Sequence, residues 1–215
     1  MELGVAFSDP LADGPIIEKL HHQGIAMGLN LRRSLEFADK VKQVSAIPLI
    51  LFTYFNPVYQ MGLDLFRQEC QSAGIEAVIV PDLILEELQL RSHPDLEFIP
   101  MVAPSSSDDR LELAAAMQSS FIYCVSVRGV TGVRSLPEDE IRTYLQRVKE
   151  KSQSPLALGF GISSAGQISR FREAADGVVV GSHLAQIMEE YSSRPALLPA
   201  QIEQTIAGFK KACRV

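Results

Sequence analysis

The chain has 215 residues, 47% hydrophobic and 21% charged, which fits a single domain over residues 1–215 with a full core. The net charge is −6 and no run of Lys or Arg stands out, which argues against nucleic acid or an acidic membrane as the main partner. No signal peptide and no apolar run of the roughly 18 residues that a membrane helix needs are evident, and the three cysteines form no CxxC pattern, so we expect reduced thiols in a cytoplasmic protein.

The first fifteen residues predict a short strand followed by a turn-rich loop, and each carries a carboxylate. With period-two alternation, Leu3 and Val5 share one face of the strand and Glu2 lies on the other. If Leu3 and Val5 pack on helices, Glu2 points into the centre of the sheet or barrel. A charge there is costly unless it is paired or does chemistry. The second carboxylate, Asp13, lies in the loop.

Helical and strand patterns alternate along the rest of the chain. We expect strands near residues 2, 50, 78, 100, 123, 157 and 178, and helices near 16–22, 31–44, 62–73, 86–91, before 118, 138–151, 164–173, after 182, and 195–212. Short connections between such elements predict a parallel sheet. Because the glycine-rich loops follow the last two strands, we favour a (β/α)₈ TIM barrel over a doubly wound open sheet. A full barrel needs eight strands and about 250 residues, so with about seven parallel strands this chain is one βα unit short.

A candidate phosphate site follows the last two strands. Barrel enzymes often bind phosphate there, and glycine lets backbone N–H groups approach an anion closely. Gly161 and the pair Gly181 and Ser182 lie in these loops, and Gly132, after the preceding strand, completes the predicted pocket. The alternative for any one glycine is that it only permits a strand-to-helix turn.

Glu2 and Asp13 form a candidate acid/base pair, because proton transfer needs a donor and an acceptor beside the reacting bond. The alternatives are local. Asp13 starts an Asp-Gly-Pro turn that also suits helix entry, and Glu2 lies beside the chain terminus, where side chains are often solvated.

Aromatic residues at or near strand ends suit a flat aromatic substrate, with core packing as the alternative for each; they are Phe7, Phe52, Tyr54, Tyr123 and Phe160. The histidines show no ligand spacing, so we interpret His21, His22, His93 and His183 as surface or packing residues and expect no metal site.

Several of these loops together resemble the tryptophan synthase alpha subunit family. The matching segments, in order and spacing, are residues 2–15 (ELGVAFSDPLADGP), 52–57 (FTYFNP), 80–83 (VPDL), 103–104 (AP), 129–132 (GVTG), 159–163 (GFGIS) and 180–182 (VGS). The match runs the whole length of the chain, and chance agreement of so many loops is implausible.

The resemblance implies retro-aldol cleavage of indole-3-glycerol phosphate to indole and glyceraldehyde 3-phosphate, in tryptophan biosynthesis. It assigns Glu2 as the acid/base that protonates indole C3, Asp13 as the group that holds the indole N–H, and Tyr123 as a third active-site residue. Substrate-binding positions are Phe52, Tyr54, Val102, Thr131 and Phe160, and phosphate-binding positions are Gly132, Gly161, Gly181 and Ser182. No cofactor is implied, since pyridoxal phosphate would belong to the beta subunit, the expected partner in an alpha2beta2-type complex.

Three departures from the family pattern leave alternatives open. The family has one more βα unit before Glu2, which supplies part of the indole pocket, so the resemblance implies an N-terminally truncated barrel. The second hypothesis is therefore a catalytically impaired fragment, or a non-catalytic protein that binds or activates a partner. Leu83-Ile84 differs in a loop that faces the beta subunit, and Val127-Arg128 differs beside the phosphate loop. A free-standing lyase without a beta subunit is a third possibility, and other phosphate-binding barrels rank low because they lack the Glu2 and Asp13 segment.

Overall fold

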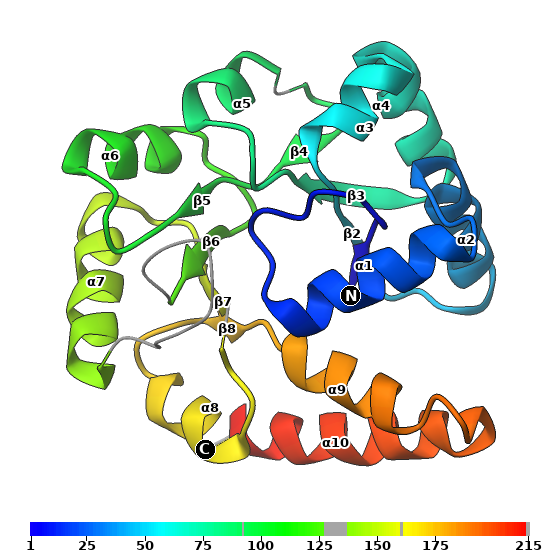
Figure 1. Ribbon diagram of the computed structural model, residues 1–215. Helices are drawn as coiled ribbons and strands as arrows, with labels where there is room; N and C mark the ends of the chain where they lie inside the picture. Colours follow the sequence, from blue (N-terminus) through cyan, green and yellow to red (C-terminus); the bar gives the residue numbers. More distant parts are fainter. Residues whose placement is uncertain (92, 127–136, 160, 214–215) are drawn as a thin grey trace.

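The computed structural model describes residues 1–91, 93–126, 137–159 and 161–213, which alternate between strands and helices (Figure 1). The strands are β1 (Glu2–Gly4), β2 (Leu49–Phe52), β3 (Ile75–Ile79), β4 (Glu97–Phe98), β5 (Met101–Val102), β6 (Ile122–Val125), β7 (Leu156–Gly159) and β8 (Gly177–Val178). The helices are α1 (Pro15–Ala26), α2 (Leu31–Val44), α3 (Phe55–Met61), α4 (Leu63–Ser72), α5 (Leu85–Arg91), α6 (Asp108–Ala116), α7 (Glu138–Lys151), α8 (Ala165–Phe171), α9 (Ser182–Glu190), the 3₁₀ turn η1 (Pro195–Leu197) and α10 (Leu198–Cys213).

All strand pairs within the two sheets are parallel, with the orders β1-β2-β3-β4 and β5-β6-β7-β8. The helices lie outside the strands in a broken ring (Figure 1). The predicted fold class, α/β with about seven parallel strands of a (β/α)₈ barrel, is confirmed. The expected strand near residue 100 is present as β4 and β5, which are separated by Ile99 and Pro100. Proline has no N–H to donate to a ladder, which explains the interruption.

Side chains alternate between an outer and an inner layer of the barrel. On β2, Leu49 and Leu51 belong to an outer cluster with helix residues such as Leu35 and Phe66. Phe52 instead belongs to an inner cluster with residues from β3 and β6, and Ile50 packs against that cluster. This alternation follows from the period of two in a strand. It defines which side chains reach the barrel interior, where the candidate site lies.

The outer strands are β1 and β4 in one sheet and β5 and β8 in the other. β4 and β5 follow each other directly along the chain, whereas β1 and β8 have, within the described residues, only one strand partner each. Helices bridge the two sides. α1 contacts α9, Lys19 forms an ion pair with Glu189, and the Ile17 side chain lies close to Gly181. Helix α1 is therefore held against α9.

Helix α3 was not predicted, because Pro57 after Phe55 and Asn56 suggests a turn. Proline is tolerated in the first turn of a helix, where its missing N–H costs no hydrogen bond. The Phe55 N–H donates to Asp82 Oδ1 at 2.9 Å, so a carboxylate from the loop after β3 satisfies the first turn. The beginning of α3 thus depends on a tertiary contact that local sequence does not reveal.

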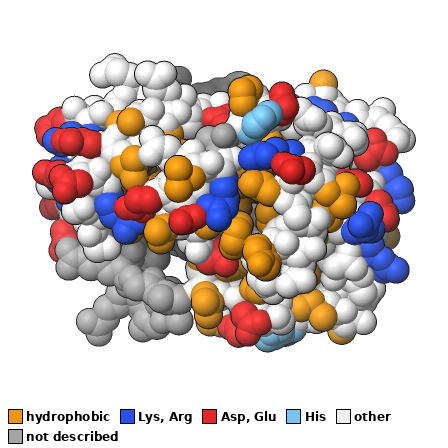
Figure 2. Space-filling view, turned by 90° about the horizontal axis from the view of Figure 1, so that it is seen from above, with side chains coloured by type: hydrophobic (Ala, Val, Ile, Leu, Met, Phe, Trp, Pro, Cys, Tyr) orange, Lys and Arg blue, Asp and Glu red, His pale blue; other side chains and the backbone are white. Residues whose placement is uncertain are grey.

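The face above α5 and α4 mixes charged side chains of both signs with apolar ones (Figure 2). On α5, Arg91 pairs with Glu87, and Arg110 of α6 pairs with Glu86, while Leu90 is exposed. This mixture gives the face no extended basic patch. No described helix is long and apolar enough to cross a membrane.

Candidate active site

Glu2 faces the barrel interior, as predicted. It pairs with Ile50 in the ladder between β1 and β2, and Ile50 packs against the inner cluster. The residue is accessible to solvent, but many protein atoms surround its carboxyl group. The resulting loss of hydration is the largest cause that raises the pKa of this carboxyl from 4.5 to about 7. The Asp13 charge raises this pKa further, and the chain's N-terminal amine lowers it. Such a carboxyl exchanges protons near neutral pH, as an acid/base group must.

Asp13 is buried, with 6% of its side chain exposed, and it is held by two other side chains. The Tyr54 hydroxyl donates to Asp13 Oδ2 at 2.6 Å, and His21 Nε2 lies 3.3 Å from the same oxygen. The Ala12 N–H donates to the Tyr54 hydroxyl at 3.0 Å, and burial, the hydrogen bond to Asp13 and the Asp13 charge all raise the Tyr54 pKa. Asp13 is therefore more than a turn residue, because two buried side chains, Tyr54 and His21, lie against its carboxylate.

His21 is buried and contacts a candidate catalytic group, and sequence reasoning missed this role. Its side chain is 8% exposed, and its Nδ1 accepts a hydrogen bond from the Phe7 N–H at 3.0 Å. Helical spacing could have revealed it, since Ile17, His21 and Gly24 fall on one face of α1 and both His21 and Gly24 are buried. The interpretation of His21 as a packing residue was thus incomplete.

Tyr123 lies in the inner cluster, as predicted, and its ring lies against Gly159 of β7. A Cβ atom at Gly159 would stand 2.3 Å from the Tyr123 hydroxyl, so only glycine leaves room for this ring. Burial is the largest cause that raises the Tyr123 pKa, and the charges of Glu2 and Asp13 raise it further. The structure therefore brings the three predicted catalytic residues into one electrostatic neighbourhood.

Two of the predicted substrate-binding residues, Phe52 and Tyr54, belong to the inner cluster, and Phe7 packs against it. Phe7 stacks on Tyr54 with ring centroids 5.1 Å apart. Val102 does not reach this region. It pairs with Cys124 of β6, and both side chains lie in the outer cluster against α6 and α7. By alternation, its neighbour Met101 takes the position that packs against the inner cluster.

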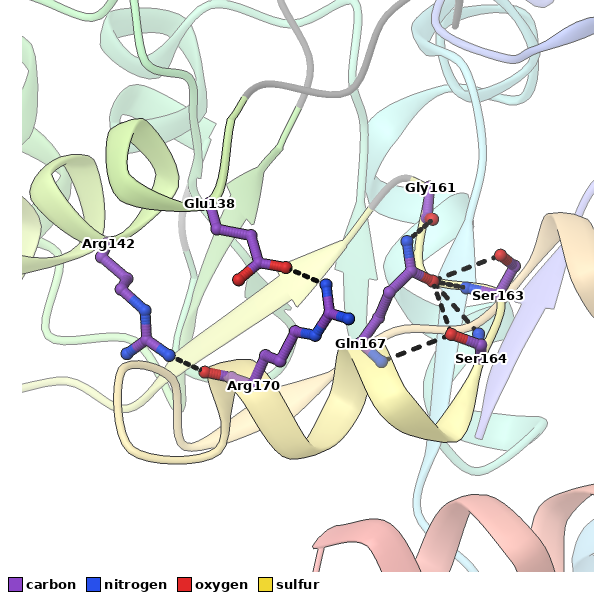
Figure 3. A network of polar contacts seen from close by, with 7 residues as sticks. All are labelled: Glu138, Arg142, Gly161, Ser163, Ser164, Gln167 and Arg170. Atoms are coloured by element: carbon purple, nitrogen blue, oxygen red, sulfur yellow. Dashed lines mark hydrogen bonds and ion pairs between the residues drawn. The ribbon is translucent and has the colours of Figure 1, made fainter.

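The loop after β7 carries Gly161 and is held by hydrogen bonds from α8 (Figure 3). Gly161 has φ of +85°, a conformation that favours glycine. Gln167 Oε1 accepts the N–H groups of Ser163 and Ser164 at 2.9 and 3.1 Å, and the Ser164 hydroxyl accepts the Gln167 N–H at 3.3 Å. This capping box confirms the predicted start of a helix at this point, with Ser164 as its cap.

The second glycine loop leads from β8 into α9. Gly181 is the N-cap residue of α9, and Ser182 is its first residue. The first N–H groups of a helix have no partner within the helix, and the helix dipole favours an anion there. Gly181 and Ser182 therefore occupy a position suited to a phosphate group.

Three predicted positions, Thr131, Gly132 and Phe160, lie outside the described residues, as does the Val127-Arg128 stretch. Among the residues that are described, no group of three or more His, Cys, Asp or Glu side chains could hold a metal ion. Of the cysteines, Cys70 and Cys124 are buried and Cys213 is exposed, and all three are free. Burial is the main cause that raises the pKa of Cys70 and Cys124 to about 12, which makes them poor nucleophiles at neutral pH.

Comparison with known proteins gives one consistent family. The family model described as tryptophan synthase alpha chain matches residues 1–214. A tryptophan synthase alpha chain from Syntrophomonas wolfei is 60% identical over 98% of this chain and 81% of that protein. Among solved structures, tryptophan synthase subunit alpha from Legionella pneumophila has a TM-score of 0.85 at 29% identity, covering 99% of this chain and 80% of that one. The tryptophan synthase a2b2 complex from Pyrococcus furiosus has a TM-score of 0.86 at 30% identity, covering 98% and 86%.

Proposed function

The chain belongs to the tryptophan synthase alpha chain family, and from this premise we propose that it is a carbon–carbon lyase of tryptophan biosynthesis. It cleaves indole-3-glycerol phosphate into indole and glyceraldehyde 3-phosphate, with residues 1–215 acting as one domain. The observation that carries this assignment is the interior Glu2 carboxyl, whose pKa is raised to about 7 beside Asp13. A carboxyl with that pKa can both give and take a proton at neutral pH.

Proton transfer to indole C3 is the role that we assign to Glu2. Protonation there places positive charge on the ring nitrogen, and the ring N–H then donates to the Asp13 carboxylate. As the bond between C3 and the side chain breaks, the adjacent hydroxyl gives its proton to the Glu2 carboxylate, which was left deprotonated by the first step, and becomes the aldehyde. The electrons of the broken bond return to the ring and neutralise its nitrogen, which completes the indole. Tyr123, which lies in the inner cluster and whose pKa responds to both charges, contacts the substrate between them.

The ring and the phosphate of the substrate occupy different walls of the site. Phe52, with Phe7 and Tyr54 packed beside it, supplies an apolar surface for the flat indole ring. Gly161, Gly181 and Ser182 bind the phosphate through backbone N–H groups and the α9 N-terminus. We also assign Thr131 and Phe160 to substrate binding and Gly132 to phosphate binding, from the family motifs alone.

The partner that we propose is a tryptophan synthase beta subunit, since a similar structure is named as a tryptophan synthase a2b2 complex. The alpha chain needs no cofactor for its own step, and pyridoxal phosphate belongs to the beta subunit. The place of action that we propose is the cytoplasm, where amino-acid biosynthesis supplies the substrate.

The test is release of indole from indole-3-glycerol phosphate by the purified chain, measured with and without a beta subunit. Glu2→Gln and Asp13→Asn should each lower turnover by roughly 10²- to 10⁴-fold, the usual value of a proton-transfer group. Glu36→Gln and Asp39→Asn, which change exposed carboxylates on α2, serve as matched controls. If the chain releases no indole under either condition, the proposal fails. Stimulation by the beta subunit separates a partnered enzyme from a free-standing lyase.

A further inference from the structure

The Asp13 carboxylate is surrounded by buried polar side chains. Its Oδ2 atom lies within hydrogen-bond reach of two buried donors, the Tyr54 hydroxyl at 2.6 Å and His21 Nε2 at 3.3 Å. Tyr54 is fully buried and His21 is 8% exposed, so bulk water does not compete for either contact. Both contacts end on the same carboxylate oxygen, Oδ2.

The other nitrogen of the His21 ring, Nδ1, determines the tautomer of the neutral ring. The Phe7 N–H donates to Nδ1 at 3.0 Å, so Nδ1 is an acceptor without a proton. In the neutral imidazole the proton then lies on Nε2, the nitrogen that stands 3.3 Å from Asp13 Oδ2. The Phe7 N–H thus favours the tautomer with the proton on Nε2, which can donate to the Asp13 carboxylate. In metal-binding histidines, a hydrogen bond to the second ring nitrogen fixes the tautomer in the same way.

Close packing of α1 brings the ring to this place. A Cβ atom on Gly24 would lie 3.1 Å from the Ala6 Cβ, so glycine lets α1 approach the segment after β1 closely. One turn earlier on the same helix face, His21 meets the Phe7 backbone and the Asp13 side chain. The contact is therefore built by the docking of a whole helix and is independent of a flexible side chain.

We propose that His21 is a positioning residue for the reaction: its Nε2–H and the Tyr54 hydroxyl fix the Asp13 carboxylate so that Oδ1 receives the ring N–H of the substrate. This inference rests on the proposed function of Asp13. The alternative is that His21 only anchors residues 6–12 through Phe7. The two roles use different ring nitrogens, so they can be separated by substitution.

The two amide side chains imitate one ring nitrogen each. In His21→Gln, the amide nitrogen stands near the place of Nε2 and can still donate to Asp13. In His21→Asn, the amide oxygen stands near the place of Nδ1 and can still accept from Phe7, but no donor reaches Asp13. We expect His21→Asn to lower kcat roughly tenfold to hundredfold, the usual effect of a lost hydrogen bond to a charged group, with KM almost unchanged. His21→Gln should keep kcat within about threefold of the original chain, again because the charged hydrogen bond survives.

Melting temperatures of both variants show whether they fold. Equal kcat losses in His21→Asn and His21→Gln, or a normal kcat in His21→Asn, would overturn the positioning role. A contact measurement that needs no turnover completes the test. In the ¹⁵N-labelled chain, the His21 imidazole should show the Nε2–H tautomer, and Asp13→Asn should shift its Nε2 signal, whereas Asp9→Asn should not.

An unchanged His21 signal in Asp13→Asn would also overturn the proposal. If the original chain proves inactive but its His21 signal responds to Asp13→Asn, the proposed function fails and the contact stands. The two failures are therefore distinguishable.

Discussion

Glu2 changes its charge within the neutral pH range, and this has a consequence for stability. In the unfolded chain it ionises near pH 4.5, whereas burial and the Asp13 charge keep it protonated in the folded chain up to about pH 7. The stability linked to Glu2 is thus fully present below pH 4.5 and is lost as the pH rises through 7. Glu2→Gln cannot ionise, so its melting temperature should rise relative to the original chain between about pH 5 and about pH 8. Glu36→Gln is the control, and a difference that does not vary with pH would contradict the shifted pKa.

Position 159 must be glycine because the Tyr123 ring lies directly against it. In Gly159→Ala the new methyl group would overlap the Tyr123 ring, at 2.3 Å from its hydroxyl. We expect a loss of about 1–3 kcal/mol in the free energy of unfolding, as in other overpacked cores, together with reduced turnover. Gly166→Ala is the matched control, because open space surrounds that position within α8 and alanine favours a helix. Urea denaturation of both variants measures the effect, and equal stabilities would mean that the ring moves freely aside.

At the scale of elements, α8 and the loop before it form one unit. Ser164 caps the helix, and Gln167 returns to the N–H groups of Ser163 and Ser164 and to the Gly161 carbonyl (Figure 3). Ser164→Ala should cost about 0.5–2 kcal/mol of stability, the usual value of a helix cap. Because the Ser164 hydroxyl also donates to the Gln167 side chain, whose amide nitrogen donates to the Gly161 carbonyl, KM for indole-3-glycerol phosphate should rise more than kcat falls. Gln146→Ala, on the exposed face of α7, is the control. A change in stability without a change in KM would separate the helix cap from substrate binding.

The sequence predicted elements well where a local pattern determines them. The alternation Glu2, Leu3, Val5 correctly placed Glu2 toward the interior, and the helix expected near residues 62–73 is present as α4 (Leu63–Ser72). It failed where a distant partner decides. α3 begins at Phe55 because Asp82 accepts its N–H, and His21 gains a role only when α1 docks on Phe7. Val102 was predicted from a family motif, but strand alternation turns its side chain to the outer cluster.

For the whole molecule, the outer strands β1 and β8 matter most. Each of β1 and β8 pairs on one side only within the described residues, and an open strand edge is a template for pairing with another chain. We therefore expect self-association that grows with protein concentration, measured by sedimentation velocity. Gly177→Lys places a charge at an exposed position of β8 and should weaken this association. A monomer at all concentrations would show that the edges are protected in solution.

The contact between α1 and α9 also has a consequence for selectivity. Asp13 lies two residues before Pro15, where α1 begins, and Ile17, in the first turn of that helix, lies close to Gly181 at the start of α9. The separation between Asp13, which we propose to bind the ring, and Gly181, which we propose to bind the phosphate, is thus set by the first turn of α1. This fixed separation should select substrates by length. A substrate whose chain between ring and phosphate is one carbon longer or shorter would not reach Asp13 with its ring N–H and Gly181 with its phosphate at the same time. The chain would then discriminate by length as well as by chemical group.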